Sequence, residues 1–123
     1  DTRIITTVVG NGDFANPDTV HDGASATTVP ISTHLGFGFD GDGRLVIITS
    51  SGNSESAQIA QRFVRVENGL LQVISEHLIG DTPDGSPLAS ARFRNPFLVG
   101  ILGDGSIVIL EDQVLRVARG PLL

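Results

Sequence analysis

The sequence predicts an all-β chain built from two tandem copies of one strand-rich unit. The stretch from Asp22 to Ile48 recurs without a gap from Asp84 to Leu110, so equivalent residues are 62 positions apart. Short apolar and β-branched runs alternate with turns rich in Gly, Asn and Asp. A repeat of this length is typical of supersecondary units that bury an apolar face against a neighbouring copy. We therefore expect two four-stranded antiparallel sheets.

The composition limits the classes of protein that fit this chain. Its 123 residues correspond to one domain, and a hydrophobic fraction of 40% is enough for a core. The net charge of -6 argues against binding to nucleic acid or to an anionic membrane, since both need clustered cations. Cysteine is absent, which excludes disulfides and thiolate metal sites. The chain begins at Asp1 and contains no Met, which processing of a precursor or trimming of the chain would each explain; of the two, we expect a mature exported protein.

The first unit contains four predicted strands joined mainly by tight turns. The strands are 35–40, 45–50, 62–67 and 70–75. The first pair flanks Gly41-Asp42-Gly43, whose residue types suit positive φ, and the second pair flanks Asn68-Gly69, a strong hairpin signal. The long connection over residues 10–34 is rich in Pro, Ser and Thr, and we expect only a short helical turn near 24–28.

The second unit repeats this order but ends after three strands. These strands are 97–102, 106–111 and 114–119, and a short helical turn is expected near 88–93. The run from Phe97 to Leu102 is apolar on both faces, which is typical of a fully buried strand. The β-branched run Ile4 to Val9 resembles a fourth strand with no unit before it. We therefore divide the chain into a donated outer strand (1–9), a complete unit (10–75) and a unit that lacks its outer strand (76–123).

The repeated motifs resemble those of the NHL-repeat β-propellers. The likeness is carried by ITTVVGNG, by DGDGRLVII followed by SSGN, and by DGSPLASARFRNPFLVGI with GDGSIVILED in the second unit. Where that family commonly has Tyr and Ala-Asp in the second strand, this chain has Val46 and Ile48-Thr49, and an insertion follows Asn53. The resemblance implies four-stranded blades arranged radially around an axis. It implies no single chemistry, since members bind protein, peptide or RNA and a few are metal-dependent lyases.

Three groups of residues are candidate chemical sites. His21, His34 and His77 would suit a metal-dependent enzyme, but they do not recur at the 62-residue spacing, and we expect solvated loop histidines. The oxygen-rich segment from Asn11 to Asp22 could hold Ca²⁺, although it lacks the spacing of a calcium loop. Glu111-Asp112 could serve acid–base chemistry, but an exposed tight turn is the commoner case. We expect no catalytic residue, metal or cofactor.

The strand order places the long connections at one end of both units. Binding residues usually lie on long, polar loops that are held by a rigid scaffold. The candidate ligand-binding residues at that end are His34, Ser50, Asn53, Asn95, Glu111 and Asp112.

Because two blades cannot close a ring, we expect a homo-oligomer, with a trimer of six blades preferred and a tetramer of eight next. The expected function is a non-enzymatic binding or scaffold module with a protein, peptide or glycan ligand. The alternatives are a lyase- or lactonase-like metalloenzyme and a carbohydrate-binding propeller. The chain being a fragment of a longer propeller, or pairing with a different polypeptide, is the rival to self-assembly.

Overall fold

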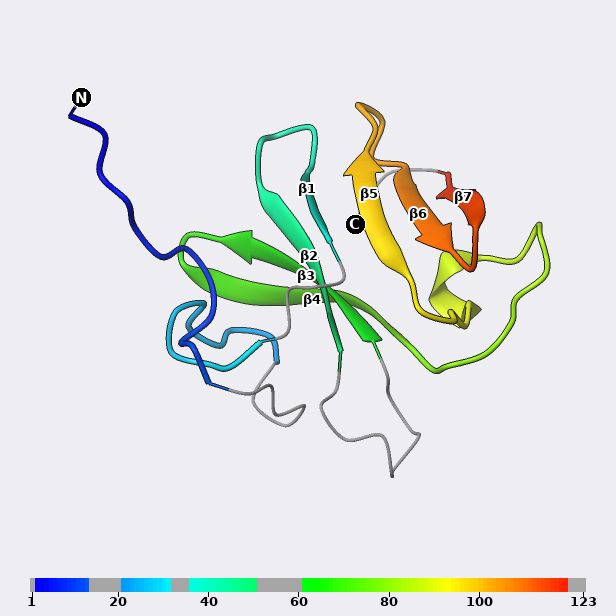
Figure 1. The fold of residues 1–123 in the computed structure, drawn as a ribbon, viewed down its shortest axis with the longest axis horizontal. Helices are drawn as coiled ribbons and strands as arrows, with labels where there is room; N and C mark the ends of the chain where they lie inside the picture. Colours follow the sequence, from blue (N-terminus) through cyan, green and yellow to red (C-terminus); the bar gives the residue numbers. More distant parts are fainter. Residues whose placement is uncertain (1, 14–20, 32–35, 51–60, 120–123) are drawn as a thin grey trace.

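The described part of the chain forms two antiparallel sheets and contains no α-helix (Figure 1). In the computed structural model the described residues are 2–13, 21–31, 36–50 and 61–119. Sheet one has the order β1 (Phe37–Phe39), β2 (Leu45–Ser50), β3 (Gln61–Glu67) and β4 (Leu70–His77). Sheet two has the order β5 (Phe97–Ile101), β6 (Ile107–Glu111) and β7 (Val114–Ala118). The predicted all-β class is confirmed; where two four-stranded antiparallel sheets were expected, the described residues form one four-stranded and one three-stranded antiparallel sheet.

The connections follow the turn chemistry of the sequence. Gly43 and Gly105 have φ values of 80° and 89° in the two equivalent hairpins, and Asn68 and Gly69 have 53° and 76°. Positive φ at both central residues is the geometry of a tight two-residue hairpin. A 3-10 turn (η2, Leu88–Ser90) lies where a short helical turn was expected. No helix in the described ranges is long and apolar enough to cross a membrane.

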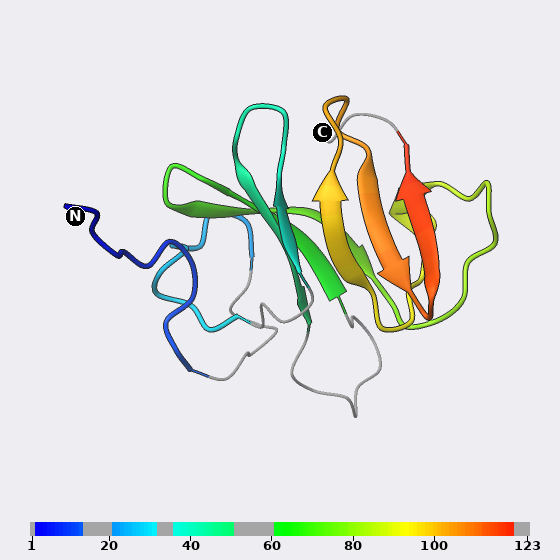
Figure 2. The ribbon, with the colours of Figure 1, turned by 45° about the horizontal axis from the view of Figure 1, so that its top comes forward.

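The first strands of the two sheets, β1 and β5, run parallel and side by side, as Figures 1 and 2 show. A parallel bridge joins Gly36 to Leu98. A Cβ added to Gly38 would lie 3.4 Å from the Gly100 Cα, and one added to Gly41 would lie 3.3 Å from the Gly103 carbonyl oxygen. All three contacts join residues 62 positions apart, so the segment from Gly36 to Gly41 lies along its own repeat counterpart. The close approach explains the glycines at positions 36, 38 and 41, in and beside β1.

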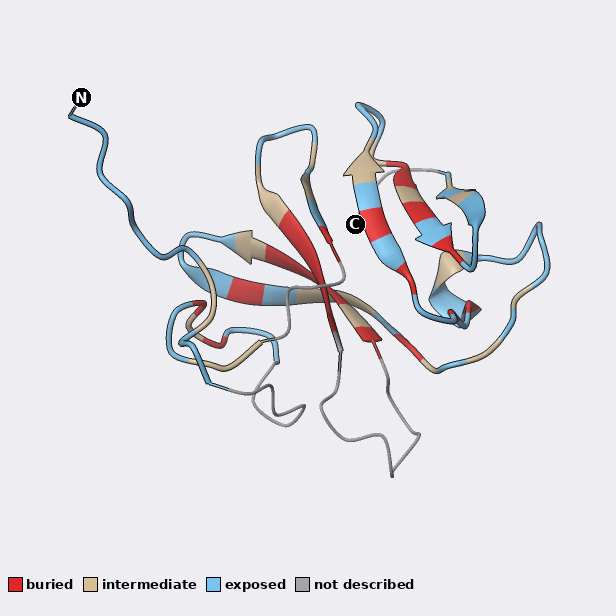
Figure 3. Cartoon of the chain, in the orientation of Figure 1, coloured by how far each residue is buried: buried red, intermediate tan, exposed pale blue. Residues whose placement is uncertain are grey.

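Two apolar clusters make up the core (Figure 3). The first lies between the sheets. It joins Val46, Ile48 and Phe63 of sheet one to Leu98, Ile107 and Ile109 of sheet two, with Ala91 and Phe93 from the connection between the sheets. We call these two surfaces the contact faces of sheets one and two.

The second cluster covers part of the opposite side of sheet one. It contains Ile47, Val64 and Leu71, and residues Ala24 and Ala26 pack onto them. We call this side, which also carries Phe37, Phe39 and Leu45, the open face of sheet one. The open face of sheet two carries Phe97, Leu110, Leu115 and Val117.

One sequence prediction differs from the structure, and another concerns a segment that lies outside both sheets. Residues 4–9, predicted as a strand donated to another copy, are unpaired within the single chain, and most of this segment is exposed and extends away from both sheets (Figure 1). The run from Phe97 to Leu102 is a strand only to Ile101, and it is not buried on both faces. Leu98 is buried, whereas Phe97 and Val99 are about half exposed. In both cases the described chain supplies no layer or strand to cover these apolar residues.

Candidate functional site

The topology places the long connections at one end of both sheets. Chain direction alternates from strand to strand, and β1 runs parallel to β5, so the hairpins at 40–44, 68–69 and 102–106 share one end. The ends of β2, β4 and β6 lie at the other end, which we call the loop end (Figure 2). Ser50 is the last residue of β2, and Asp112, its repeat counterpart, follows β6. His34 and Asn53 lie outside the described residues.

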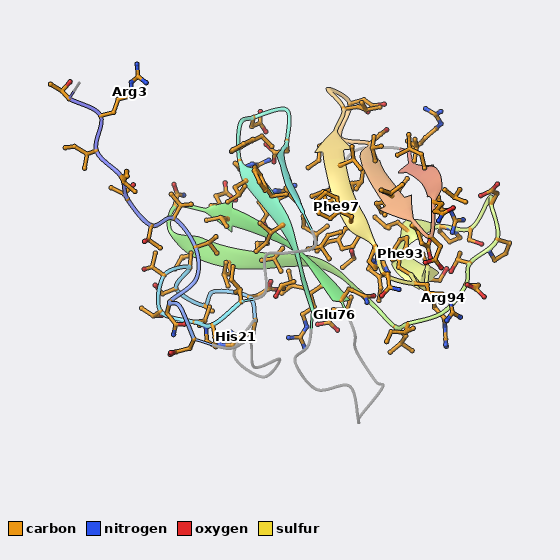
Figure 4. All side chains as sticks on the ribbon, viewed as in Figure 1. Arg3, His21, Glu76, Phe93, Arg94 and Phe97 are labelled. Atoms are coloured by element: carbon orange, nitrogen blue, oxygen red, sulfur yellow. The ribbon has the colours of Figure 1, made fainter. Side chains whose placement is uncertain are left out.

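Glu111 joins three segments at the loop end of sheet two. Its Oε1 accepts a hydrogen bond of 2.7 Å from the backbone N–H of Arg94, and its Oε2 pairs with Arg116 Nη1 at 3.2 Å. Arg116 also pairs with Asp84 at 3.2 Å. Figure 4 shows Arg94 in the connection that precedes β5. The Glu111 carboxylate is buried and bound on both oxygens, so it anchors the connection to β6.

Asn95 and Asp112 lie next to this anchor and are exposed. Asn95 follows Arg94 directly and has a φ of 51°, while Asp112 follows Glu111 and has a φ of 43°. Such left-handed conformations are more accessible to Asn and Asp than to most residues. The structure therefore brings Asn95, Glu111 and Asp112 to one corner, and it leaves two of them free to meet a ligand.

His77 is buried, which corrects the expectation of a solvated loop histidine. Its ring contacts Phe63 and Phe93 at centroid distances of 4.9 and 4.8 Å. His77 Nδ1 lies 2.8 Å from the Ala91 carbonyl oxygen and Nε2 lies 2.8 Å from Ser75 Oγ. Because a carbonyl only accepts, Nδ1 carries the proton and Nε2 accepts from the serine hydroxyl.

The surroundings of His77 favour its neutral form. Burial lowers the pKa of His77, against smaller opposing effects of the Ala91 carbonyl and Glu76.

The sequence prediction missed the burial of His77 because the predicted strand ends at Ser75, two residues short of the end of β4. Extending the two-residue alternation to His77 would have placed its ring on the same side as Ser75. The ring is thus part of the core between the sheets.

An acidic and basic cluster stabilises the hairpin end of sheet one. Asp40 Oδ1 accepts the backbone N–H groups of Asp42 and Arg44 at 3.0 and 2.9 Å. Its Oδ2 pairs with Arg44 Nε at 2.9 Å and Arg65 Nε at 3.2 Å. Burial raises the pKa of Asp40, but these hydrogen bonds outweigh it and the net effect is a lowered pKa. The cluster closes the β1–β2 hairpin and ties it to β3.

Sheet two has a groove along the free side of β7. The groove has a volume of about 600 Å³ and lies between β7 and the connection around residues 82–88. Leu88, Ile109, Val114 and Ala118 contribute apolar lining, and Arg116 contributes charge. An apolar hollow of about 660 Å³ also lies on the open face of sheet one, lined by Phe37, Phe39, Leu45 and Val66 among others.

Among the described residues, no group of three or more His, Cys, Asp or Glu side chains is placed to hold a metal ion. The described ionisable side chains at the loop end are bonded within the fold or exposed at a turn. Unpaired apolar surface is instead concentrated on the open faces and beside β7. No protein-family model, curated protein or solved structure matches this chain. A functional assignment for this chain therefore rests on its geometry.

Proposed function

We propose that this chain is a two-blade unit of a homo-oligomeric β-propeller that serves as a non-enzymatic binding or scaffold module. The observation that carries the proposal is the parallel arrangement of β1 and β5, in which repeat counterparts lie opposite each other. A rotation that relates two sheets in this way, applied again, generates a radial series of sheets around an axis. Three chains would supply six sheets and four chains would supply eight.

The distribution of exposed apolar residues supports repetition of the contact between the sheets. Ile48 on the contact face of sheet one is 0% exposed, whereas its repeat counterpart Leu110 on the open face of sheet two is 43% exposed. On the other side of the contact, Ile101 packs against the core, whereas its counterpart Phe39 is 56% exposed. Each open face is thus the equivalent of a face that is covered inside the chain.

Complementarity of this kind favours a second copy as the partner. The open face of sheet two would pack on the open face of sheet one of the next chain, in a heterologous contact that closes by rotation. The contact would cover apolar surface that a monomer leaves in water.

Gly100 supports the same arrangement independently. Its counterpart Gly38 is crowded by sheet two, but a Cβ on Gly100 would meet no atom within 4 Å, and its φ is not positive. Neither sterics nor backbone conformation within the described chain requires glycine there. Glycine would be required at position 100 if β1 of the next chain packed against β5 in the way that β5 packs against β1 inside the chain.

A binding role fits the loop end better than catalysis does. Glu111 is engaged by Arg94 and Arg116, and His77 is bonded inside the core. Asn95 and Asp112 would be presented repeatedly around the ring, as a polar surface for a protein, peptide or glycan ligand. Repeated weak contacts of one kind strengthen binding through effective concentration.

Variants on the open face of sheet two test this proposal. Gly100→Val adds a side chain where the single chain has room, and Leu110→Glu places a charge on the proposed contact. Leu70→Glu is the matched control, because Leu70 is similarly exposed and lies on the opposite side of sheet one from Leu71.

We expect wild type and Leu70→Glu to have the mass of three or four chains in light scattering. Gly100→Val and Leu110→Glu should run as single chains that keep their β-sheet circular dichroism. Retention of the oligomer by both interface variants would contradict the proposed contact.

A further inference from the structure

In sheet one, β4 is held on both of its edges. One edge pairs with β3 along its length. The other edge pairs with residues 23–26 of the connection before β1. Three backbone hydrogen bonds of 2.8 Å make this pairing: Gly23 N–H to the Leu71 carbonyl, Leu71 N–H to the Ala24 carbonyl, and Ala26 N–H to the Gly69 carbonyl just before β4. β4 therefore fills a slot between a strand and a connecting segment.

The corresponding slot in sheet two is the groove beside β7. Residues 85–88 are the repeat counterparts of 23–26, and β7 is the third strand of sheet two as β3 is the third strand of sheet one. Between them lies open space of about 600 Å³. Asp22 accepts a hydrogen bond from the β4 backbone at Val73, whereas its counterpart Asp84 pairs with the Arg116 side chain across the groove. The groove is therefore flanked by the equivalents of the two segments that hold β4 in sheet one.

We infer that this groove accepts residues 4–9 of a neighbouring copy as an antiparallel fourth strand of sheet two; the inference rests on the proposed ring. The segment IITTVV aligns with LLQVIS, residues 70–75 of β4, and both precede a copy of the repeated stretch. In this alignment Ile5 corresponds to Leu71. Ile5 is 99% exposed and Leu71 is 2% exposed. The added strand would carry Ile5 into the groove beside Ala118.

Residues 4–9 lie far from the groove of their own chain. The N-terminal segment and β7 lie at opposite ends of the molecule in both views (Figures 1 and 2). Figure 4 shows Arg3 near the tip of this segment, away from the sheets. The next chain, whose sheet one would pack on the open face of sheet two, presents its own residues 4–9 beside that β7. This repeats the path from β4 into β5 within one chain.

Engineered cysteines test the inference, because the natural chain has none. The pairing of Arg65 with Gln72 in sheet one corresponds to Val117 with Thr6, and the pairing of Val66 with Leu71 corresponds to Ala118 with Ile5. Adjacent antiparallel pairs alternate in spacing, so two double variants are used, Thr6→Cys with Val117→Cys and Ile5→Cys with Ala118→Cys. The control is Thr6→Cys with Leu70→Cys, since both edges of β4 are occupied.

Each full-length variant is oxidised and then denatured without reductant. We expect at least one of the two pairs to give mainly covalent species of three or four chains, which reduction returns to single chains, and we expect the control pair to give no such species. Two results would overturn the strand exchange and leave the ring standing, provided that the wild type is an oligomer. One is that neither test pair forms a cross-link between chains, and the other is that the control pair cross-links as much as the test pairs do. Monomeric wild type would overturn both the exchange and the ring. Cross-linking of each chain to itself would overturn the exchange alone.

Discussion

Gly36 shows how one residue fixes the contact between the sheets. Its φ is 93°, and a Cβ at this position would collide with the Leu98 carbonyl. The parallel bridge between Gly36 and Leu98 therefore depends on the absence of a side chain.

Gly36→Ala should lower the free energy of unfolding by about 1–3 kcal/mol from the backbone strain, with a further loss from the clash. Gly43→Ala is the control, because Gly43 has a φ of 80° but no atom lies within 4 Å of its added Cβ. Urea denaturation should rank Gly36→Ala as the more destabilised variant. Equal losses would show that the two inner strands do not approach closely at this point.

His77 makes stability depend on pH. Its pKa in the folded chain is lowered, mainly by burial, from an unfolded value of 6.5. The folded state therefore binds a proton less readily than the unfolded state, and stability is complete above pH 6.5 and falls as the pH drops through the folded pKa. Carboxylates add their own loss at lower pH, because Asp40 and Asp104 have pKa values below the usual 3.8.

Thermal melting between pH 7.5 and 5 should show this dependence. We expect the melting temperature of wild type to fall across the range and that of His77→Gln to fall less, whatever its starting value. A wild-type melting temperature as flat as that of the variant would mean that His77 is accessible to protons in the folded state.

The strands were largely predictable from local sequence, whereas their surroundings were not. Leu45–Ser50 and the hairpin at Asn68-Gly69 follow from β-branched runs and turn residues, which act within a few positions. The burial of Glu111 and His77 depends on Arg94, Ala91 and Phe93, which are distant in sequence or lie in irregular connections. The exposed face of β5 could not be predicted, because an apolar pattern does not identify whether another part of the chain covers it.

Removing residues 1–8 tests the role of the N-terminal segment as an element. This deletion keeps Val9 and the hydrogen bond from Gly10 N–H to the Ala26 carbonyl, so the cover of sheet one remains. We expect the truncated chain to lose the oligomer and to unfold at lower denaturant concentration, because β7 would have a free edge. A truncated chain that still formed the oligomer would show that these residues are dispensable for assembly.

At the scale of the whole molecule, the proposed contact between copies would account for several separate features. The covered face of each sheet has an uncovered counterpart on the other sheet, Gly100 faces open space where Gly38 faces sheet two, and the groove beside β7 matches the unpaired segment 4–9. A heterologous contact that repeats the one inside the chain would use all of them, and closure would leave no apolar end. The loop end of every sheet would then face the same side of the ring.

The mass of the wild-type chain in solution tests this account most directly. Light scattering across a range of micromolar concentrations should give one species with the mass of three chains, or of four, that does not grow as concentration rises, because a closed ring has no free contact. A chain that remains a monomer at these concentrations, or one whose mass increases without limit, would contradict the closed ring.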